Sequence, residues 1–251
     1  MLTLLKKELR EQWRTRRFLV VVAVLVIFGL TSPLMARYLP ELIKQVGGIE
    51  GLDQLIPTPT VVDALGQYLK NSFQFGMILA LLVPMGAVVG EKDRGTAAMV
   101  LSKPVSRTSF LMAKFVTVAL VFLAGILLAA LGAYYYTGIL FQWLNLGAFI
   151  LFNLLFWIDL LVYVALTLVA STLARSTVAA GGIGFGLFMV LWIAGAIPQV
   201  GKYLPDALQI WGMNIALGRG GDPAWGALGV SLGLIAAALV GAVLIFRRQE
   251  I

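Results

Sequence analysis

Six separate runs of apolar residues dominate this sequence, and each is long enough to cross a lipid bilayer as a helix. A helix rises about 1.5 Å per residue, so about 20 residues span a hydrocarbon core of about 30 Å. The runs are continuous rather than alternating, which excludes a transmembrane β-barrel. We therefore predict an all-α, polytopic membrane protein, a single transmembrane domain over 1–251 whose six spans lie approximately at 18–35, 73–90, 110–136, 146–173, 178–198 and 225–246.

Composition removes several other classes of protein. Hydrophobic residues make up 60% of the chain and charged residues 12%, whereas soluble domains average about 45–50% and about 25%. Cys and His are both absent, which removes disulfides, thiol chemistry, the commonest metal ligand and the commonest general base. We therefore expect neither a soluble enzyme nor a secreted disulfide scaffold, and no catalytic or metal site.

The distribution of basic residues predicts the orientation. Fourteen of the 19 Lys and Arg residues lie in the N-terminal arm, between the second and third spans, after the fourth span and after the sixth. The positive-inside rule places these segments in the cytoplasm. We therefore expect a multi-pass protein of the cell inner (cytoplasmic) membrane with both termini cytoplasmic. The net charge of +7 is then a topology signal, so we expect no nucleic-acid partner.

Residues 1–17 form a basic, amphipathic arm ahead of the first span. At about 100° per residue, an apolar stripe and a basic stripe lie side by side. Such a helix lies in the interfacial plane, with its apolar side in the acyl boundary of the lipid bilayer and its cations toward phosphates. We predict an interfacial elbow helix that is either a plain anchor or also touches a cytoplasmic partner; its defining residues are Leu5, Leu9, Arg10, Trp13 and Arg14.

Two outer connections, 37–72 and 199–224, are long. In the first, Thr60 is an N-cap candidate for a short helix over 61–70. The second is apolar enough to contain short helices that dip into the outer leaflet. Small residues at steps of four predict close helix packing on two spans. They are Gly125, Ala129 and Ala133 on the third, and Gly229, Gly233, Ala237 and Gly241 on the sixth.

The cytoplasmic segment 91–107 joins the second and third spans. Its residues predict a charged exit, a short helix over 96–101 entered at Gly95 with a capping hydroxyl on Thr96, a break at Pro104, and a new helix starting near Ser106. Residue properties alone leave two interpretations open. The segment is either a plain connector or a compact helical knob below the membrane.

This segment resembles the membrane subunit of ABC transporters of the type-2 export class. The shared pattern is Glu-x-x-x-Gly-Thr-x-x-x-x-Leu-x-x-Pro-x-Ser-Arg-x-x-x-Leu-x-x-Lys, met here by Glu91, Gly95, Thr96, Leu101, Pro104, Ser106, Arg107, Leu111 and Lys114. The resemblance extends to the amphipathic arm, the six spans and both long outer loops. The family's branch that assists maturation of nitrous oxide reductase shares this pattern, so export and accessory maturation both stay open.

The resemblance implies that 91–107 is a coupling helix that docks on a separate ABC ATPase subunit. It also implies a second permease copy, in a homodimer or in a heterodimer with a related chain. The residues expected at the ATPase-coupling surface are Glu91, Asp93, Arg94, Gly95, Thr96, Met99, Leu101, Lys103, Pro104, Arg107 and Arg175. The chain has no Gly-x-x-x-x-Gly-Lys-Ser/Thr. We therefore expect no cofactor and no enzyme activity in this chain, with ATP and Mg²⁺ bound by the partner.

Asp159 is an acid near the middle of the fourth predicted span. A charge at that depth costs about 2.5–3.5 kcal/mol, so the side chain should face the bundle or a wet cavity. Tyr163, Thr167 and Ser171 continue a polar stripe toward the cytoplasm. Either a substrate or cation contact or a structural acid fits this pattern. The resemblance places the second and fifth spans beside the translocation path. The candidate path residues on these spans, together with Asp159, are Phe75, Met77, Phe185 and Met189.

Two alternatives to an ATP-driven exporter permease differ in class. A channel or scaffold that is not driven by ATP would have no need of the 91–107 pattern. An intramembrane zinc protease requires His, which is absent, and an aspartyl enzyme requires a second carboxylate beside Asp159, which the sequence does not reveal. The permease is the leading interpretation. Apolar path residues would suit an amphiphilic substrate, but the same residue types form ordinary helix contacts, so the substrate stays open.

Overall fold

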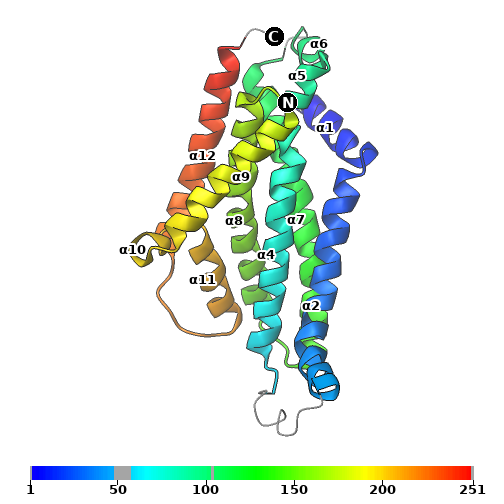
Figure 1. Cartoon of the computed structure of the whole chain (residues 1–251), viewed down its shortest axis with the longest axis vertical. Helices are drawn as coiled ribbons and strands as arrows, with labels where there is room; N and C mark the ends of the chain where they lie inside the picture. Colours follow the sequence, from blue (N-terminus) through cyan, green and yellow to red (C-terminus); the bar gives the residue numbers. More distant parts are fainter. Residues whose placement is uncertain (1, 48–57, 103–104, 250–251) are drawn as a thin grey trace.

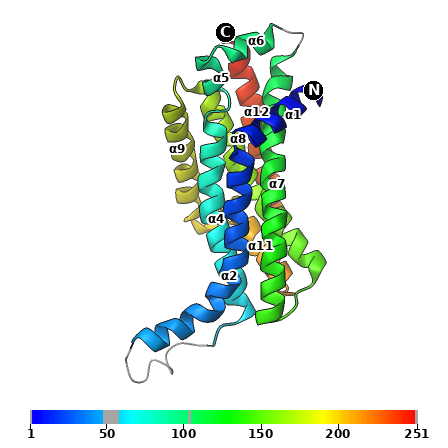
Figure 2. The ribbon, with the colours of Figure 1, turned by 90° about the vertical axis from the view of Figure 1, so that its right-hand side faces the viewer.

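In the computed structural model, which describes residues 2–47, 58–102 and 105–249, every regular element is a helix. Within these ranges six helices are long and apolar enough to cross a membrane, so the predicted fold class is confirmed. Figures 1 and 2 show an elongated bundle with both chain ends near the same end. The helices are α1 Leu2–Arg14, α2 Arg17–Gly47, α4 Val61–Met85, α5 Val89–Asp93, α6 Thr96–Leu101, α7 Arg107–Leu140, α8 Leu146–Leu173, α9 Thr177–Gly195, α10 Pro198–Gly201, α11 Asp206–Ala216 and α12 Trp225–Arg247.

The first two spans are longer than predicted. Helix α2 continues to Gly47 through Pro33 and Pro40, and Figure 2 shows its last part leaning away from the bundle, because proline removes intrahelical hydrogen bonds and bends a helix. The expected short helix over 61–70 is the beginning of α4 and not a separate element. The backbone N–H of Thr60 donates to Asp63 Oδ2 at 2.8 Å, which confirms that the helix starts here. The outer connection therefore contracts to 48–60.

The other boundaries follow the apolar runs closely. The fourth predicted span, 146–173, is α8 residue for residue, because Asn145 Oδ1 accepts a hydrogen bond from the Ala148 N–H and caps the helix. The third and sixth spans lie within α7 and α12. The fifth ends at Gly195 rather than at 198, because Pro198 opens α10 instead of continuing α9.

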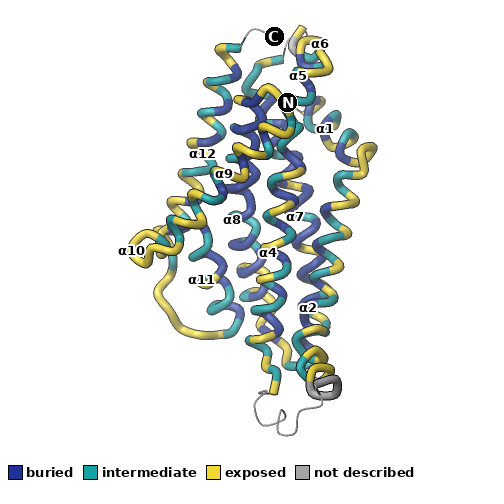
Figure 3. Tube along the Cα trace, in the orientation of Figure 1, coloured by how far each residue is buried: buried dark blue, intermediate teal, exposed yellow. Residues whose placement is uncertain are grey.

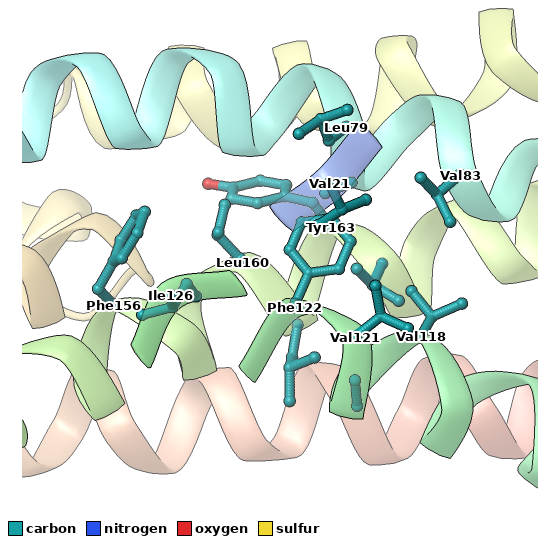
Figure 4. Packing of buried hydrophobic residues seen from close by; sticks show 14 of the residues in the cluster. Val21, Leu79, Val83, Val118, Val121, Phe122, Ile126, Phe156, Leu160 and Tyr163 are labelled. Carbon is teal, nitrogen blue, oxygen red and sulfur yellow. The ribbon is translucent and has the colours of Figure 1, made fainter. Parts of the chain in front are cut away.

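Helix α8 is the centre of the bundle. Helices α4, α7, α9, α11 and α12 all pack against it, and Figure 3 shows most of its length as buried. The largest apolar cluster includes Phe122, Phe156 and Leu160, and Figure 4 shows these side chains with Tyr163 and Leu79 between the helices. A helix that is apolar on all sides is stable only when it is surrounded by other helices or lipid, which explains the near-absence of periodicity in α8.

The two ridges of small residues have different outcomes. On α7, Gly125, Ala129 and Ala133 are buried, and a Cβ atom added to Gly29 of α2 would lie 2.7 Å from Ala129 Cα. The predicted close packing of the third span is therefore confirmed. On α12, Cβ atoms added to Gly229, Gly233 or Gly241 would meet no atom of the described chain within 4 Å. That ridge does not pack against the described part of the chain, which contacts the opposite side of α12.

The outer connection 199–224 folds back onto the bundle. It contains α10 and α11, and the buried side of α11 packs against α8. A Cβ atom on Gly212 would lie 2.9 Å from Phe152 Cδ2, so the two helices approach closely at this glycine. Figure 1 shows α11 beside the lower half of α8, below the end of α9. The prediction of short helices in this connection is confirmed.

Candidate functional site

The C-terminal end of the second span breaks where it makes a polar contact with α8. Helix α4 ends at Met85, directly after Pro84, and α5 begins at Val89. The backbone N–H groups of Val88 and Val89 donate to Ser171 Oγ at 3.1 and 3.3 Å. Ser171 thus pairs two donors that a helix start leaves unsatisfied, and it fixes where the chain leaves the bundle.

Helices α5 and α6, residues 89–101, form what we call the knob. Gly95 joins them with φ = +67°, a left-handed conformation that favours glycine. The Thr96 hydroxyl donates to the Glu91 carbonyl at 3.2 Å, so it closes α5 rather than capping α6 as predicted. Figure 1 shows α6 beyond the end of the bundle, and Met99 is 71% exposed. The short helix over 96–101 is confirmed.

The next helix begins where the sequence predicts. Ser106 is the N-cap of α7, and its hydroxyl oxygen accepts a hydrogen bond from the Ser109 N–H at 3.1 Å. Lys103 and Pro104, which were expected at the coupling surface, lie outside the described residues, and so does the side chain of Leu101. The predicted break at Pro104 therefore stays a prediction.

Glu91 is not a surface residue. It is 3% exposed, and its Oε1 atom accepts hydrogen bonds from Lys114 Nζ at 2.7 Å and Lys7 Nζ at 2.9 Å. Lys114 is itself buried and also contacts Glu8 at 3.2 Å. The break after α4 turns this side chain toward α1 and α7, so Glu91 holds the base of the exposed segment, and its direct contact with an ATPase stays a prediction. We call Lys7, Glu8, Glu91 and Lys114 the buried ion-pair network.

The network balances two carboxylates with two ammonium groups. Buried charges are costly unless they are paired and hydrogen-bonded, and this arrangement pairs them across three helices. Partial burial alone would lower the pKa of Lys7, but hydrogen bonds to Glu91 and Glu8 and the charges of both carboxylates raise it above its ordinary value. Lys7 therefore stays charged at neutral pH. The network joins the amphipathic arm (α1), the knob (α5) and the third span (α7).

Three carboxylates, two of them in the network, lie close together at the base of the knob. Oxygen atoms of Glu8, Glu11 and Glu91 lie within 4.8 Å of one another, a spacing that a divalent cation could use. Lys7 contacts all three carboxylates, at 3.0, 3.5 and 2.9 Å respectively. The ammonium groups thus already supply the positive charge, and we assign no metal here.

Arg107 contacts the C-terminal end of α12. Its Nη1 atom donates to the carbonyl oxygens of Phe246, Arg247 and Gln249, at 2.6, 3.0 and 2.8 Å. A cation suits the C-terminal end of a helix, where carbonyl groups are unpaired. Arg107 therefore closes the C-terminal end of α12, and contact of this half-buried side chain with a partner stays a prediction. Lys92 joins the knob to the end of α8, because its ammonium group donates to the Thr172 carbonyl oxygen at 2.9 Å.

Replacing Arg107 with Ala should loosen the C-terminal end of α12. Three carbonyl groups lose a charged donor, which we expect to lower the free energy of unfolding by about 1.5–3 kcal/mol. Limited proteolysis should then cut near Arg247 and Arg248 faster than in the parent chain. Arg175→Ala is the matched control, since Arg175 is exposed; equal cleavage of both variants would contradict the capping role.

The remaining coupling candidates do reach the surface. Asp93, Arg94, Gly95 and Met99 of the knob are exposed, and so is Arg175 after α8. A groove of about 320 Å³ separates the knob from α1. It is lined by Lys7, Glu11, Glu91, Arg94, Thr96, Met99 and Val100. The end of the bundle near both chain termini thus presents an exposed knob beside a groove.

The N-terminal arm is a helix, as predicted, and it ends earlier than residue 17. Arg16 adopts φ = +57°, which terminates α1 and separates it from α2. Its protein-facing side is Leu4, Glu8 and Gln12, a spacing of four that the sequence analysis overlooked. The predicted stripe residues Leu9, Arg10, Trp13 and Arg14 are exposed and Leu5 is half-buried. Contact of this exposed stripe with lipid stays a prediction.

The structure does not unite the five path candidates in one cavity. Phe75 stacks on Phe28 with ring centroids 4.0 Å apart, and Met77 and Met189 pack against the apolar core. Phe185 is 51% exposed. Asp159 is buried between α8 and α11, where its Oδ2 atom accepts a hydrogen bond from Gln209. Their role in a translocation path stays a prediction.

Comparison with known proteins agrees with this architecture. A family model described as "ABC-2 family transporter protein" matches residues 2–209, a range that includes the arm, the knob and five spans. An uncharacterized transmembrane protein of Bacillus subtilis (strain 168), YxlG, is 29% identical over 256 residues, covering 100% of this chain and 98% of the relative. The match to the family covers far more than half of the sequence. This chain is therefore a member of the ABC-2 family of transporter proteins.

Proposed function

We propose that this chain is the permease subunit of an ATP-driven exporter. Two copies, or one copy and a related chain, would form the translocation path, and separate ABC ATPase subunits would bind and hydrolyse ATP. Both termini and the knob would lie in the cytoplasm, with the bundle in the inner membrane. This chain would not itself be catalytic.

One observation carries the proposal: an exposed knob is anchored to the rest of the chain by the buried ion-pair network. Met99 at the tip is 71% exposed, while Glu91 at the base contacts Lys114 at 2.7 Å. A solvated connector requires no charged anchor in the protein interior, where unpaired charges are costly. An element that must transmit force between a partner and the bundle does require one.

The geometry indicates how a movement of the knob would reach the spans. A displacement of α6 passes through Gly95 to α5. From there Glu91 leads to α1 and α7, and the backbone of Val88 and Val89 leads to Ser171 of α8. Closure of the ATPase subunits would thus shift the arm and two spans together. Transport would follow if substrate binds the two arrangements with different affinity.

Met99→Asp should abolish or strongly weaken association with the ATPase. Methionine is an adaptable apolar contact, and a carboxylate at the tip would be desolvated on docking. We expect the variant to insert and fold as the parent does, because the side chain is exposed. The measurement is co-purification from the natural host in mild detergent, with the partner identified by a Gly-x-x-x-x-Gly-Lys-Ser/Thr sequence and by ATP hydrolysis.

Gln142→Asp is the matched control, because it adds the same charge at an exposed position in the connection between α7 and α8, at the other end of the bundle. It should leave ATPase recovery unchanged, and Met99→Leu should do the same. If Met99→Asp retains a stoichiometric ATPase and full transport, the docking role of the knob is wrong. A parent chain that never recovers an ATPase would favour a channel or scaffold.

A further inference from the structure

A second polar cluster lies farther back along α8, away from the end that contacts the base of the knob, and is not used by the proposed coupling. Asp159 of α8 is 0% exposed, and its Oδ2 atom accepts a hydrogen bond from the Gln209 amide. One turn along α8, the Tyr163 hydroxyl donates to Asp206 Oδ1 at 3.1 Å. Gln209 and Asp206 both belong to α11, so every polar contact in this cluster joins α11 to α8.

The two carboxylates have no basic partner in the described part of the chain. Neither forms an ion pair there, and the contacts of Gln209 and Asp206, which lie within one turn of α11, bring both acids to the same α8–α11 contact. The neighbouring helices explain this: α9 contains no charged residue, and the basic residues of α7 and α12 all lie near their cytoplasmic ends. Lys202, which precedes α11 in the same connection, places its ammonium group over the Tyr203 ring. The remaining charged residues of the packed helices are Asp63 and Lys70 of α4.

One oxygen of the cluster lacks any hydrogen-bond partner. Asp159 Oδ1 is buried and unpaired, although buried polar atoms are almost always satisfied. Two like charges close together in a low-dielectric interior cannot both persist without a cation. Burial also raises the pKa of Asp206, and the hydrogen bond from Tyr163 offsets only part of that effect. The cluster therefore requires positive charge that the described chain does not supply.

We propose that Asp159 and Asp206 form a binding site for a single proton, and that this proton keeps α11 packed against α8. A proton fits better than a larger cation because Asp159 Oδ1 is sealed from solvent by its neighbours. Asp206 is only partly buried, which gives the proton a route to the surface. Loss of the proton would leave two buried negative charges between the helices and push α11 outward.

The proposal fixes the sign of a pH dependence. An acid that keeps its proton in the folded chain to higher pH than in the unfolded chain makes the folded chain bind more protons, so stability falls as pH rises. The unfolding temperature of the purified chain in detergent should therefore fall from pH 6 to pH 9. Asp159→Asn replaces the protonated acid by a neutral amide of the same shape, and it should remove roughly half of that fall or more.

The matched control is Asp222→Asn, an exposed acid in the same outer connection, which should keep the full pH dependence. Asp206→Asn should flatten the profile as Asp159→Asn does. To separate a proton from an alkali cation, the parent is compared at pH 9 in NaCl, KCl and choline chloride at equal ionic strength. Equal unfolding temperatures support the proton.

Three results would overturn the proposal. The first is a parent profile that does not change between pH 6 and pH 9, and the second is a pH dependence that Asp159→Asn leaves unaltered. The third is a recovery of stability by Na⁺ or K⁺ over choline that Asp159→Asn removes, which would assign the site to a metal cation. None of these measurements requires an ATPase, so the outcome is independent of the proposed permease function.

Discussion

Lys114→Met should be among the most damaging single substitutions in this chain. Lys114 is buried and supplies a hydrogen bond to Glu91 at 2.7 Å and contacts with both Glu8 oxygens at 3.2 Å. Methionine keeps most of the volume but leaves two buried carboxylates with only Lys7 as a cation. Breaking a buried ion pair by removing one partner costs about 3–5 kcal/mol. We expect a loss of that size in thermal unfolding of the purified chain in detergent.

Lys6→Met is the matched control, because Lys6 lies on the exposed side of the same arm and should change stability by less than about 0.5 kcal/mol. A second comparison tests the mechanism. Replacing Glu91 by Gln in the Lys114→Met background removes one of the orphaned charges, and it should recover part of the lost stability. If Lys114→Met unfolds at the same temperature as Lys6→Met, the network does not hold the knob.

This network shows which part of the site could be predicted from the sequence. The pattern that begins at Glu91 and ends at Lys114 singled out this segment, but it did not reveal that its first and last charges contact each other. In the structure Glu91 and Lys114, the two ends of the pattern, form an ion pair. Lys7, which lies 84 residues before Glu91 in the sequence, also contacts Glu91. Helical periodicity reports which residues share a face. It does not report which distant helix that face meets.

The spans themselves were predictable because burial in lipid imposes a local signal. The continuous apolar run predicted the full length of α8. N-cap residues fix where the helices begin, at Asn145 for α8 and at Ser106 for α7. The outer helices are different. Asp206 lies 47 residues after Asp159 in a connection of mixed character, and only the return of α11 along α8 brings it to Tyr163. The sequence analysis therefore found one acid of the pair and missed the other.

Small residues show the same limit in another form. Spacing of four predicted packing on both the third and the sixth spans, and it is right for α7 because α2 lies against Gly125 and Ala129. On α12 the glycines face away from the described chain. The pattern identifies a surface that permits close approach, while the identity of the neighbour depends on the tertiary arrangement.

Gly29→Leu should consequently disrupt the bundle, whereas the same substitution at Gly233 should not. A Cβ atom on Gly29 would overlap the Ala129 carbonyl group and lie 2.7 Å from Ala129 Cα. These atoms belong to backbone, which cannot move aside as a flexible side chain can. Overpacking typically costs about 1–3 kcal/mol and sometimes more, and we expect the upper end or beyond because α2 must separate from α7. Thermal unfolding in detergent measures the loss.

Gly233 is the matched control because it is also a glycine inside a span and has open space at its Cβ position. Leucine favours helix over glycine by about 0.5–1 kcal/mol, so Gly233→Leu should leave the isolated chain unchanged or slightly more stable. Equal destabilisation by both variants would mean that the α2–α7 contact is not tight. Stability at Gly233 alongside a large loss at Gly29 would show that backbone contact, and not glycine content, holds these two spans together.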